Sequence, residues 1–424
     1  MISRITLPLT RRFPALASRD YVLFIVGQLI SVIGTWMQST ALPYLAYRIS
    51  GRPLDLGIIG FSNTLPTLLF ALPAGVLVER WDKRKAVIVF QTIMALLAFG
   101  FAFLALTGRT QIWHIVLLAF LSGSVVSAEV TARQAMLIEL AGREALPSAI
   151  ALQTTAFNLG RVIGPLSAAW IISATGNEGS VFLANGISFI FVIAGLLLAR
   201  TRFKVESGDE KERDLRGELN EGLAYLRRNS AIMSVTLMAA LVGFFGFPLV
   251  QQIPALARDV LKTVADTEAM VAARTSNLYA AQGAGALIAA FLAAYLSSSD
   301  KNKMLLLGQI SFIIPIIILG LNQSINTSFI LLAFMGWGTV TQLVSMNTII
   351  QLQAPNEMRG RIFSIYFWAL QGVAPFGSIF IGWIAQNWDV PAAAVASGVI
   401  SLAGIIVIRL IFHRHQGING LTSG

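Results

Sequence analysis

Apolar runs of about twenty residues or more recur along almost the whole of this chain. An α-helix of that length spans the ~30 Å hydrocarbon core of a lipid bilayer. Only 12% of the residues are charged, whereas a soluble protein carries about 25%. The pattern lacks the ~10-residue alternating segments that build a membrane β-barrel. The sequence therefore predicts an all-α membrane protein that crosses the bilayer many times.

The apolar runs predict twelve transmembrane helices in two sets of six. The first set is predicted at Tyr21–Tyr47, Leu56–Val78, Ala86–Leu106, Ile112–Arg133, Ser148–Ala174 and Ser180–Leu198. The second set is predicted at Ala231–Ala257, Ser276–Leu296, Met304–Leu321, Phe329–Ile350, Arg361–Gln386 and Pro391–Phe412. Similar segments end the fourth span of each set, Ile138–Glu144 and Gln351–Glu357. We therefore expect two pseudo-symmetric six-helix bundles, over residues 1–200 and 230–424, with a substrate site between them.

The one long hydrophilic stretch, Thr201–Asn229, is predicted to be a cytoplasmic linker between the bundles, since nearly half of its residues are charged. Near its end, leucines recur at helical spacing with charges between them: Leu215, Leu219, Leu223 and Leu226. This pattern predicts an amphipathic helix. Such a helix either lies on the membrane surface or packs against the underside of the bundle.

The lysines and arginines concentrate on one side of the predicted spans, which explains the net charge of +10 without nucleic acid. By the positive-inside rule, both termini are expected in the cytoplasm and the protein in the cell (inner) membrane. The basic start before Tyr21 lacks a small-residue cleavage site, so the first span is predicted to be a retained signal-anchor. The chain has no cysteine, which excludes disulfides and thiolate metal sites.

A charged loop between the second and third spans carries a recognisable pattern, Gly75-x-x-x-Glu79-Arg80-x-Asp82-Lys83-Arg84. It resembles the signature of the major facilitator superfamily, Gly-x-x-x-Asp-Arg-x-Gly-Arg-Arg/Lys. Glu79 and Lys83 keep the charges of that signature, whereas Asp82 places a carboxylate where the superfamily has glycine. The resemblance implies the major facilitator fold.

Four further stretches are similar to the drug and siderophore exporter branch of this superfamily. They are Thr131–Ala135, Glu144–Leu152, Asn158–Pro165 and Pro355–Arg361. The resemblance covers essentially the whole chain. It is specific for the branch and does not identify a substrate.

The resemblance also implies that the charged loop is a gate latch, formed in one access state and released in the other. Glu79 would face the N-terminus of the eleventh span, where the helix dipole favours an anion and where Arg361 opens the helix. Lys83 or Arg84 would pair with an acid low on the fourth span, for which Glu129 is the candidate. Gly75 and Arg80 complete the latch motif. The alternative is that these charges only set the topology.

The fifth span contains Gly160-x-x-x-Gly164-Pro165, which resembles a motif associated with antiporters of the superfamily. Two glycines one turn apart allow close helix approach, and proline bends the span. Gly283 and Gly285 of the eighth span are the predicted facing surface. Ala168 and Ala169 stand where the superfamily form continues with glycine, so simple helix packing is the alternative.

Arg161 lies near the middle of the fifth span, where an unpaired cation is costly. It is predicted either to bind an anionic or carbonyl-rich substrate in the central cavity or to pair with a neighbouring helix. Glu129 and Arg133 lie four residues apart and share one face of the fourth span. Glu129 is also a candidate proton carrier, in addition to its candidate role as a latch residue. Further candidates for the cavity wall are polar or aromatic residues of other spans: Gln28, Trp36, Asn158, Trp337 and Gln342.

The sequence contains no phosphate-binding loop, nucleophile elbow or histidine-rich cluster, so we predict neither an enzyme nor a cofactor. The prediction is a secondary active transporter that exports an amphipathic small molecule, such as a siderophore or a macrolide, by alternating access. Proton-coupled antiport is expected, in a monomer within the lipid bilayer and without nucleic acid. The alternatives are an importer or facilitator of the same fold, a membrane sensor that does not transport, and, more remotely, a channel or an intramembrane enzyme.

Overall fold

The computed structural model describes residues 13–79, 81–201, 215–295 and 300–419. Within these ranges it does not describe the side chains of residues 71–77, 79, 215, 216, 218, 219, 294 and 413–419. In this part of the chain the regular structure is helical, and it includes no strand. The prediction of an all-α membrane protein is confirmed.

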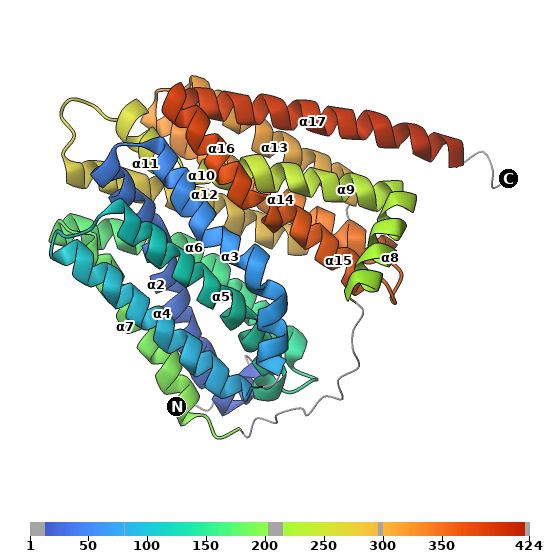
Figure 1. The fold of residues 1–424 in the computed structure, drawn as a ribbon, viewed down its shortest axis with the longest axis horizontal. Coiled ribbons are helices and arrows are strands. Elements are labelled where there is room, and N and C mark those ends of the chain that lie inside the picture. Colours follow the sequence, from blue (N-terminus) through green and yellow to red (C-terminus); the bar gives the residue numbers. More distant parts are fainter. Residues whose placement is uncertain (1–12, 80, 202–214, 296–299, 420–424) are drawn as a thin grey trace. The chain divides into compact units, whose positions relative to one another are not determined.

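Helices form at all of the predicted spans. After a short 3₁₀ turn, η1 (Pro14–Ala17), the first set comprises α2 (Arg19–Ser50), α3 (Pro53–Glu79), α4 (Lys83–Leu106), α5 (Ile112–Ala141), α6 (Leu146–Thr175) and α7 (Gly179–Leu198). The linker helix is α8 (Leu215–Arg228), which Figure 1 shows in yellow-green. The later single-helix spans are α12 (Glu268–Tyr295), α13 (Lys301–Leu321), α14 (Ile325–Gln353) and α17 (Val390–Asn419).

Two spans are interrupted helices. One contains α9 (Ser230–Leu241), the π-helical turn η2 (Val242–Gly246), α10 (Phe247–Val250), α11 (Ile253–Ala255) and a second π-helical turn, η3 (Leu256–Val260). The other contains α15 (Arg359–Phe367), the π-helical turn η4 (Trp368–Gly372) and α16 (Ala374–Asn387). Prolines follow both η2 and η4, at Pro248 and Pro375. These interruptions agree with the bends that the prolines predict.

Nine helices in the described ranges are long and apolar enough to cross a membrane. The three other predicted spans, at α3, α6 and α12, are also single helices of 27, 30 and 28 residues. Helix α6 carries Asn158 and Arg161, and helix α12 carries Arg274 and Asn277, among their otherwise largely apolar residues.

Contacts divide the chain into two compact units. Unit 1 contains residues 1–49, 65–209 and 267–280, and unit 2 contains residues 50–64, 210–266 and 281–424. Residues 50–64, from the first half of the sequence, thus belong to unit 2. Residues 267–280, from the second half, belong to unit 1. The predicted bundle boundaries at residues 200 and 230 stay a prediction.

In unit 1, α4 packs against both α5 and α7. Helices α2 and α7 approach each other at glycines, because a Cβ at Gly27 would collide with the backbone of Phe191, and one at Gly195 with the backbone of Leu23. The Tyr21 hydroxyl, on α2, donates a hydrogen bond to the carbonyl of Ala149 on α6 (3.0 Å). Close glycine packing and buried hydrogen bonds therefore replace the hydrophobic driving force that is lost in lipid.

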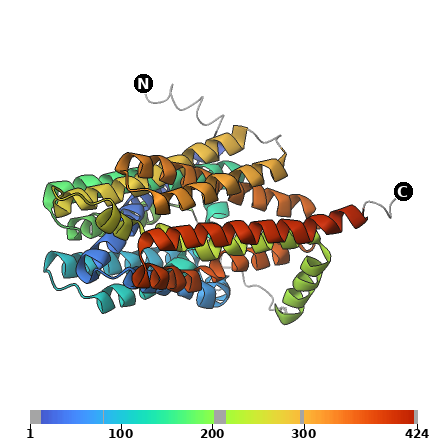
Figure 2. The ribbon, with the colours of Figure 1, turned by 90° about the horizontal axis from the view of Figure 1, so that it is seen from above.

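In unit 2, α13 packs against both α14 and α17, and α17 also runs alongside α9 (Figure 2). Glycines again set the approach of α13 and α14: a Cβ at Gly308 would collide with the backbone of Gln342, and one at Gly338 with that of Phe312. These contacts hold Gln342 with its side chain fully enclosed.

The linker helix α8 packs against α15 (Figure 1). A Cβ at Gly222 would press on the side chain of Ile365, and Leu226 is buried. Glu221 forms an ion pair with Arg361 of α15. The face of α8 that carries Gly222 and Leu226 therefore packs against helices of unit 2, which is one of the two arrangements expected for the linker helix.

Candidate functional site

The charged loop after α3 is joined to neighbouring helices of unit 1. Lys83 Nζ pairs with Glu139 Oε1 on α5 at 3.0 Å. Arg84 Nη2 donates to the carbonyl of Leu197 at the end of α7 (3.0 Å), where helix carbonyls lack partners of their own. The predicted pairing of Lys83 or Arg84 with Glu129 is wrong for this structure, because Glu139 lies closer to the end of α5 that meets the loop.

Asp82, the residue that departs from the signature, has a clear local role. It is the N-cap of α4, and its Oδ1 accepts a hydrogen bond from the backbone N–H of Lys85 (2.9 Å). Aspartate is among the strongly preferred N-cap residues because it satisfies an N–H that the helix leaves unpaired. The carboxylate therefore stabilises the start of α4.

The contacts of the remaining latch residues do not test the latch, which stays a prediction. Arg361 lies at the start of α15 as expected, and it forms an ion pair with Glu221 of the linker helix. Arg80 lies outside the described residues, as do the side-chain surroundings of Gly75 and Glu79.

Glu129 lies in a buried polar cluster in unit 1. Glu129 is only 5% exposed. Arg133, one turn later on α5, donates from Nε to both carboxylate oxygens, at 3.0 and 3.3 Å. Gln91 on α4 donates from Nε2 to Glu129 Oε1 at 2.9 Å. The carboxylate is thus compensated by one cation and one amide, which makes its burial tolerable.

Arg161 lies against the aromatic face of α2. Its guanidinium carbon is 5.6 Å from the ring centroid of Trp36, within the range of a cation–π interaction. The edge of Phe157 packs on the same indole ring (5.4 Å between centroids). The Nε atom of Arg161 is buried and, among the described residues, has no hydrogen-bond partner. A guanidinium with an unused N–H donor is well suited to donate a hydrogen bond to an oxygen atom of a ligand.

The two glycines of α6 bring Arg161 to Trp36. A Cβ at Gly160 would collide with Val32, and one at Gly164 with Trp36 and the backbone of α2. The prediction that Gly283 and Gly285 face these glycines is wrong: Gly285 instead approaches the backbone of Ala333 on α14, and Gly283 is buried in α12. Pro165 lies inside α6, directly after this contact.

The other predicted cavity residues have different environments. Gln28 is buried on α2, and within the described part of the chain its Oε1 has no donor. Asn158 donates to the carbonyl of Thr154 on its own helix (2.9 Å). Trp337 is half-buried on α14, and the amide of Gln342 lacks a partner at both ends within the described ranges. The contacts of these residues do not assign them to a common site.

Sequence reasoning missed Gln91 and Glu139, which contact the predicted residues directly. It also missed Gln309 and Arg409, which form a hydrogen bond in unit 2. A polar residue inside an apolar run is a usable signal for all of them. Their partners, however, lie on other helices, and sequence spacing does not reveal those.

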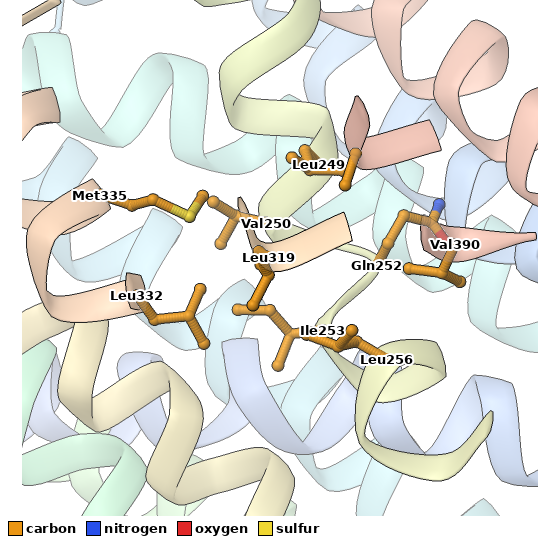
Figure 3. A pocket seen from close by; sticks show the side chains of 10 residues that line it. Leu249, Val250, Gln252, Ile253, Leu256, Leu319, Leu332, Met335 and Val390 are labelled. Carbon is orange, nitrogen blue, oxygen red and sulfur yellow. The ribbon is translucent and has the colours of Figure 1, made fainter. Parts of the chain in front are cut away.

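A small pocket in unit 2 lies apart from these residues (Figure 3). Its cavity volume is about 10 Å³, roughly the space of one water molecule. Its lining is apolar except for Gln252, and includes Leu249, Leu319, Leu332 and Met335. As described, it contains none of the predicted site residues.

Long apolar helices with glycine-mediated contacts, a compensated buried carboxylate and an intramembrane arginine describe a polytopic membrane protein with polar groups inside its spans. Solved structures show that its fold is the major facilitator fold. The chain aligns with the nucleoside transporter NupG at a TM-score of 0.72 and 11% identity, covering 93% of this chain and 99% of that one. An inward-facing bacterial homologue of the human lysosomal transporter Spinster aligns at 0.68 and 13% identity, covering 93% and 95%.

The chain belongs to the transmembrane secretion effector family, whose sequence profile matches residues 12–418. Among its relatives is the enterobactin exporter EntS of Escherichia coli K12, which is 24% identical over 395 residues, 92% of this chain and 91% of that protein. The corresponding exporter of Shigella boydii is also 24% identical, over 390 residues that cover 91% and 90%. The family resemblance read from the motifs is therefore confirmed.

Proposed function

We propose that this protein exports an amphipathic small molecule by alternating access and that Arg161 binds an anionic or carbonyl oxygen of that molecule. The observation that carries the proposal is the guanidinium of Arg161, stacked on Trp36 in the middle of α6 with an unused Nε donor. Similarity to enterobactin exporters favours a siderophore as the substrate. A macrolide-like drug is the second candidate.

The physical argument starts from the cost of a cation within the membrane. Arginine at such depth is rare and commonly marks a substrate or ion pathway. The indole ring of Trp36 compensates part of the charge, by about 0.5–2 kcal/mol. An oxygen ligand would compensate more, because charge-assisted hydrogen bonds to guanidinium are among the strong ones in proteins. Substrate binding is thus the step that satisfies Arg161.

We further propose that export is coupled to proton entry through Glu129. The cluster of Glu129, Arg133 and Gln91 is neutral when the carboxylate is charged. A proton on Glu129 would leave Arg133 uncompensated, so a change of protonation alters the local charge and favours a rearrangement of the helices that carry it. The Gln91 amide can accept from a protonated carboxyl group after rotation, since an amide offers both a donor and an acceptor.

An efflux assay tests the export proposal in a bacterial host without its own pumps. Cells loaded with a labelled catecholate siderophore or macrolide should lose it when the protein is produced, and a protonophore should abolish that loss. Arg161→Gln should reduce efflux at least tenfold, whereas Arg161→Lys should retain part of it. Thr155→Ala is the matched control on α6, because its exposed hydroxyl donates to the carbonyl of Ala151 within the same helix (2.9 Å), and it should leave efflux close to normal.

Four outcomes would contradict the proposal. Accumulation in place of loss would indicate an importer, and loss that persists with the protonophore would indicate a facilitator. Full efflux by Arg161→Gln, at equal membrane abundance, would remove Arg161 from the substrate site. If no substrate moves, a membrane sensor is the remaining alternative.

A further inference from the structure

A second intramembrane arginine, in unit 2, belongs to a short chain of polar side chains. Arg409 of α17 donates from Nη2 to Gln309 Oε1 of α13 at 2.9 Å. Gln309 is 1% exposed, and its Nε2 lies 3.1 Å from the sulfur of Met238 on α9. The guanidinium of Arg409 is thus held against α13 by a hydrogen bond to one buried amide.

The helices that form this polar chain provide no acidic side chain. The sequences of α9, α13, α14 and α17, over the bounds given above, contain no aspartate or glutamate. Arg409 contacts a neutral amide, and its buried Nε has no hydrogen-bond partner among the described residues. A guanidinium in a low-dielectric environment without a counter-charge is unfavourable. An anion from outside the chain is the simplest source of compensation.

The position of Arg409 indicates where that anion comes from. The residue lies in the last turn of the span predicted at Pro391–Phe412, near the bilayer boundary on the side of both termini. Apolar side chains around it point away from the protein: Ile406 and Leu410 on α17, and Leu306 and Ile310 on α13, are all exposed. The exposed Lys303 adds a second cation in the first turn of α13. The seam between α13 and α17 therefore combines basic heads with an apolar flank.

We propose that this seam binds an anionic phospholipid, with the phosphate on Arg409 and the acyl chains along α13 and α17. A guanidinium has five N–H donors, of which the Gln309 contact uses one. Planar guanidinium groups bind phosphate oxygens in pairs. Basic sites between transmembrane helices are known to hold anionic headgroups in the same way. The Gln309 amide is a positioning residue that orients the guanidinium toward the lipid.

Lipid binding to the purified full-length protein tests this proposal without any transport measurement. The protein is delipidated in detergent and titrated with phosphatidylglycerol or phosphatidylcholine, and bound lipid is counted by native mass spectrometry. The wild type should retain phosphatidylglycerol in preference to phosphatidylcholine. Arg409→Gln should weaken phosphatidylglycerol binding about five- to tenfold, the effect of one or more basic contacts at a membrane surface. Gln309→Leu, which keeps the charge, should weaken it less.

Arg109→Gln, which changes an exposed arginine after α4, is the matched control and should bind phosphatidylglycerol as the wild type does. Equal binding by Arg409→Gln and the wild type would overturn the proposal. So would a site occupied by free inorganic phosphate or chloride to the exclusion of phosphatidylglycerol, because the anion would then be small and soluble. If Arg409→Gln fails to fold, Arg409→Lys decides: it should bind less phosphatidylglycerol than the wild type, and unchanged binding counts against the proposal.

Discussion

Arg161 and Arg409 are both cations within predicted spans, yet their surroundings differ. Arg161 lies over the ring of Trp36, next to the cluster-bearing helices of unit 1. Arg409 donates a hydrogen bond to the amide oxygen of Gln309 at the seam between α13 and α17 of unit 2. A cation–π contact with Trp36 uses none of the N–H donors of Arg161, so an oxygen ligand can still bind them. The hydrogen bond to the Gln309 amide is directional and fixes the orientation of the Arg409 guanidinium. We therefore propose different ligands for the two arginines: a substrate for Arg161 and a lipid for Arg409.

Glu129 provides the prediction at the residue scale. Glu129→Gln keeps the shape of the side chain and removes its charge, so the variant should still fold and bind substrate but lose the coupling of efflux to the proton gradient. Efflux by the wild type into everted vesicles should rise with the imposed pH gradient, and efflux by the variant should not respond. A variant whose rate still follows the gradient would exclude Glu129 as the proton carrier. Asp82→Asn, which preserves the N-cap, serves as the control.

At the scale of the elements, the two interrupted helices of unit 2 lock together at their π-helical turns. A Cβ at Gly243 in η2 would collide with the carbonyl oxygen of Leu370 in η4. A Cβ at Gly377 in α16 would likewise collide with the carbonyl oxygen of Phe244. Pro248 has no N–H to donate, so the Phe244 oxygen lacks the partner that an α-helix would give it four residues later. π-helical turns are frequent at functional positions.

We expect Gly243→Ala to be destabilising because the added methyl group meets backbone, which cannot move aside. Overpacking of this kind costs about 1–3 kcal/mol, and denaturant unfolding in detergent measures it. Gly360→Ala is the matched control on α15, where a Cβ would meet no atom of the described structure within 4 Å. Equal stability of the two variants would show that the π-helical turns do not pack as tightly as their backbones indicate.

At the scale of the whole molecule, the asymmetric distribution of basic residues predicts the orientation in the membrane. The chain contains no cysteine, so single cysteines can be introduced without background. Arg143→Cys, in the loop between α5 and α6, should react with a membrane-impermeant maleimide only after the cells are opened. Arg109→Cys, in the loop between α4 and α5, should react in intact cells. The reverse result would place both termini outside.

Much of this architecture could be predicted from the sequence because bilayer insertion depends on properties of one segment at a time. The length and apolarity of a run decide whether it spans, and the loop motif with the similar stretches decides the family. The helices observed at the predicted spans, from α2 to α17, follow from this local rule. The resemblance also implied that Lys83 or Arg84 pairs with an acid of the fourth span, and Lys83 does pair with an acid of α5, Glu139.

The partners of these residues were decided only by the tertiary structure. Lys83 meets Glu139 and not Glu129, Gly160 and Gly164 approach α2 and not α12, and Gln91 completes the cluster around Glu129. Helices of a membrane protein are similarly apolar on many faces, so hydrophobicity does not select which of them meet. Shape complementarity at glycines and the pairing of buried polar groups make that selection, and both depend on atoms that are distant in the sequence.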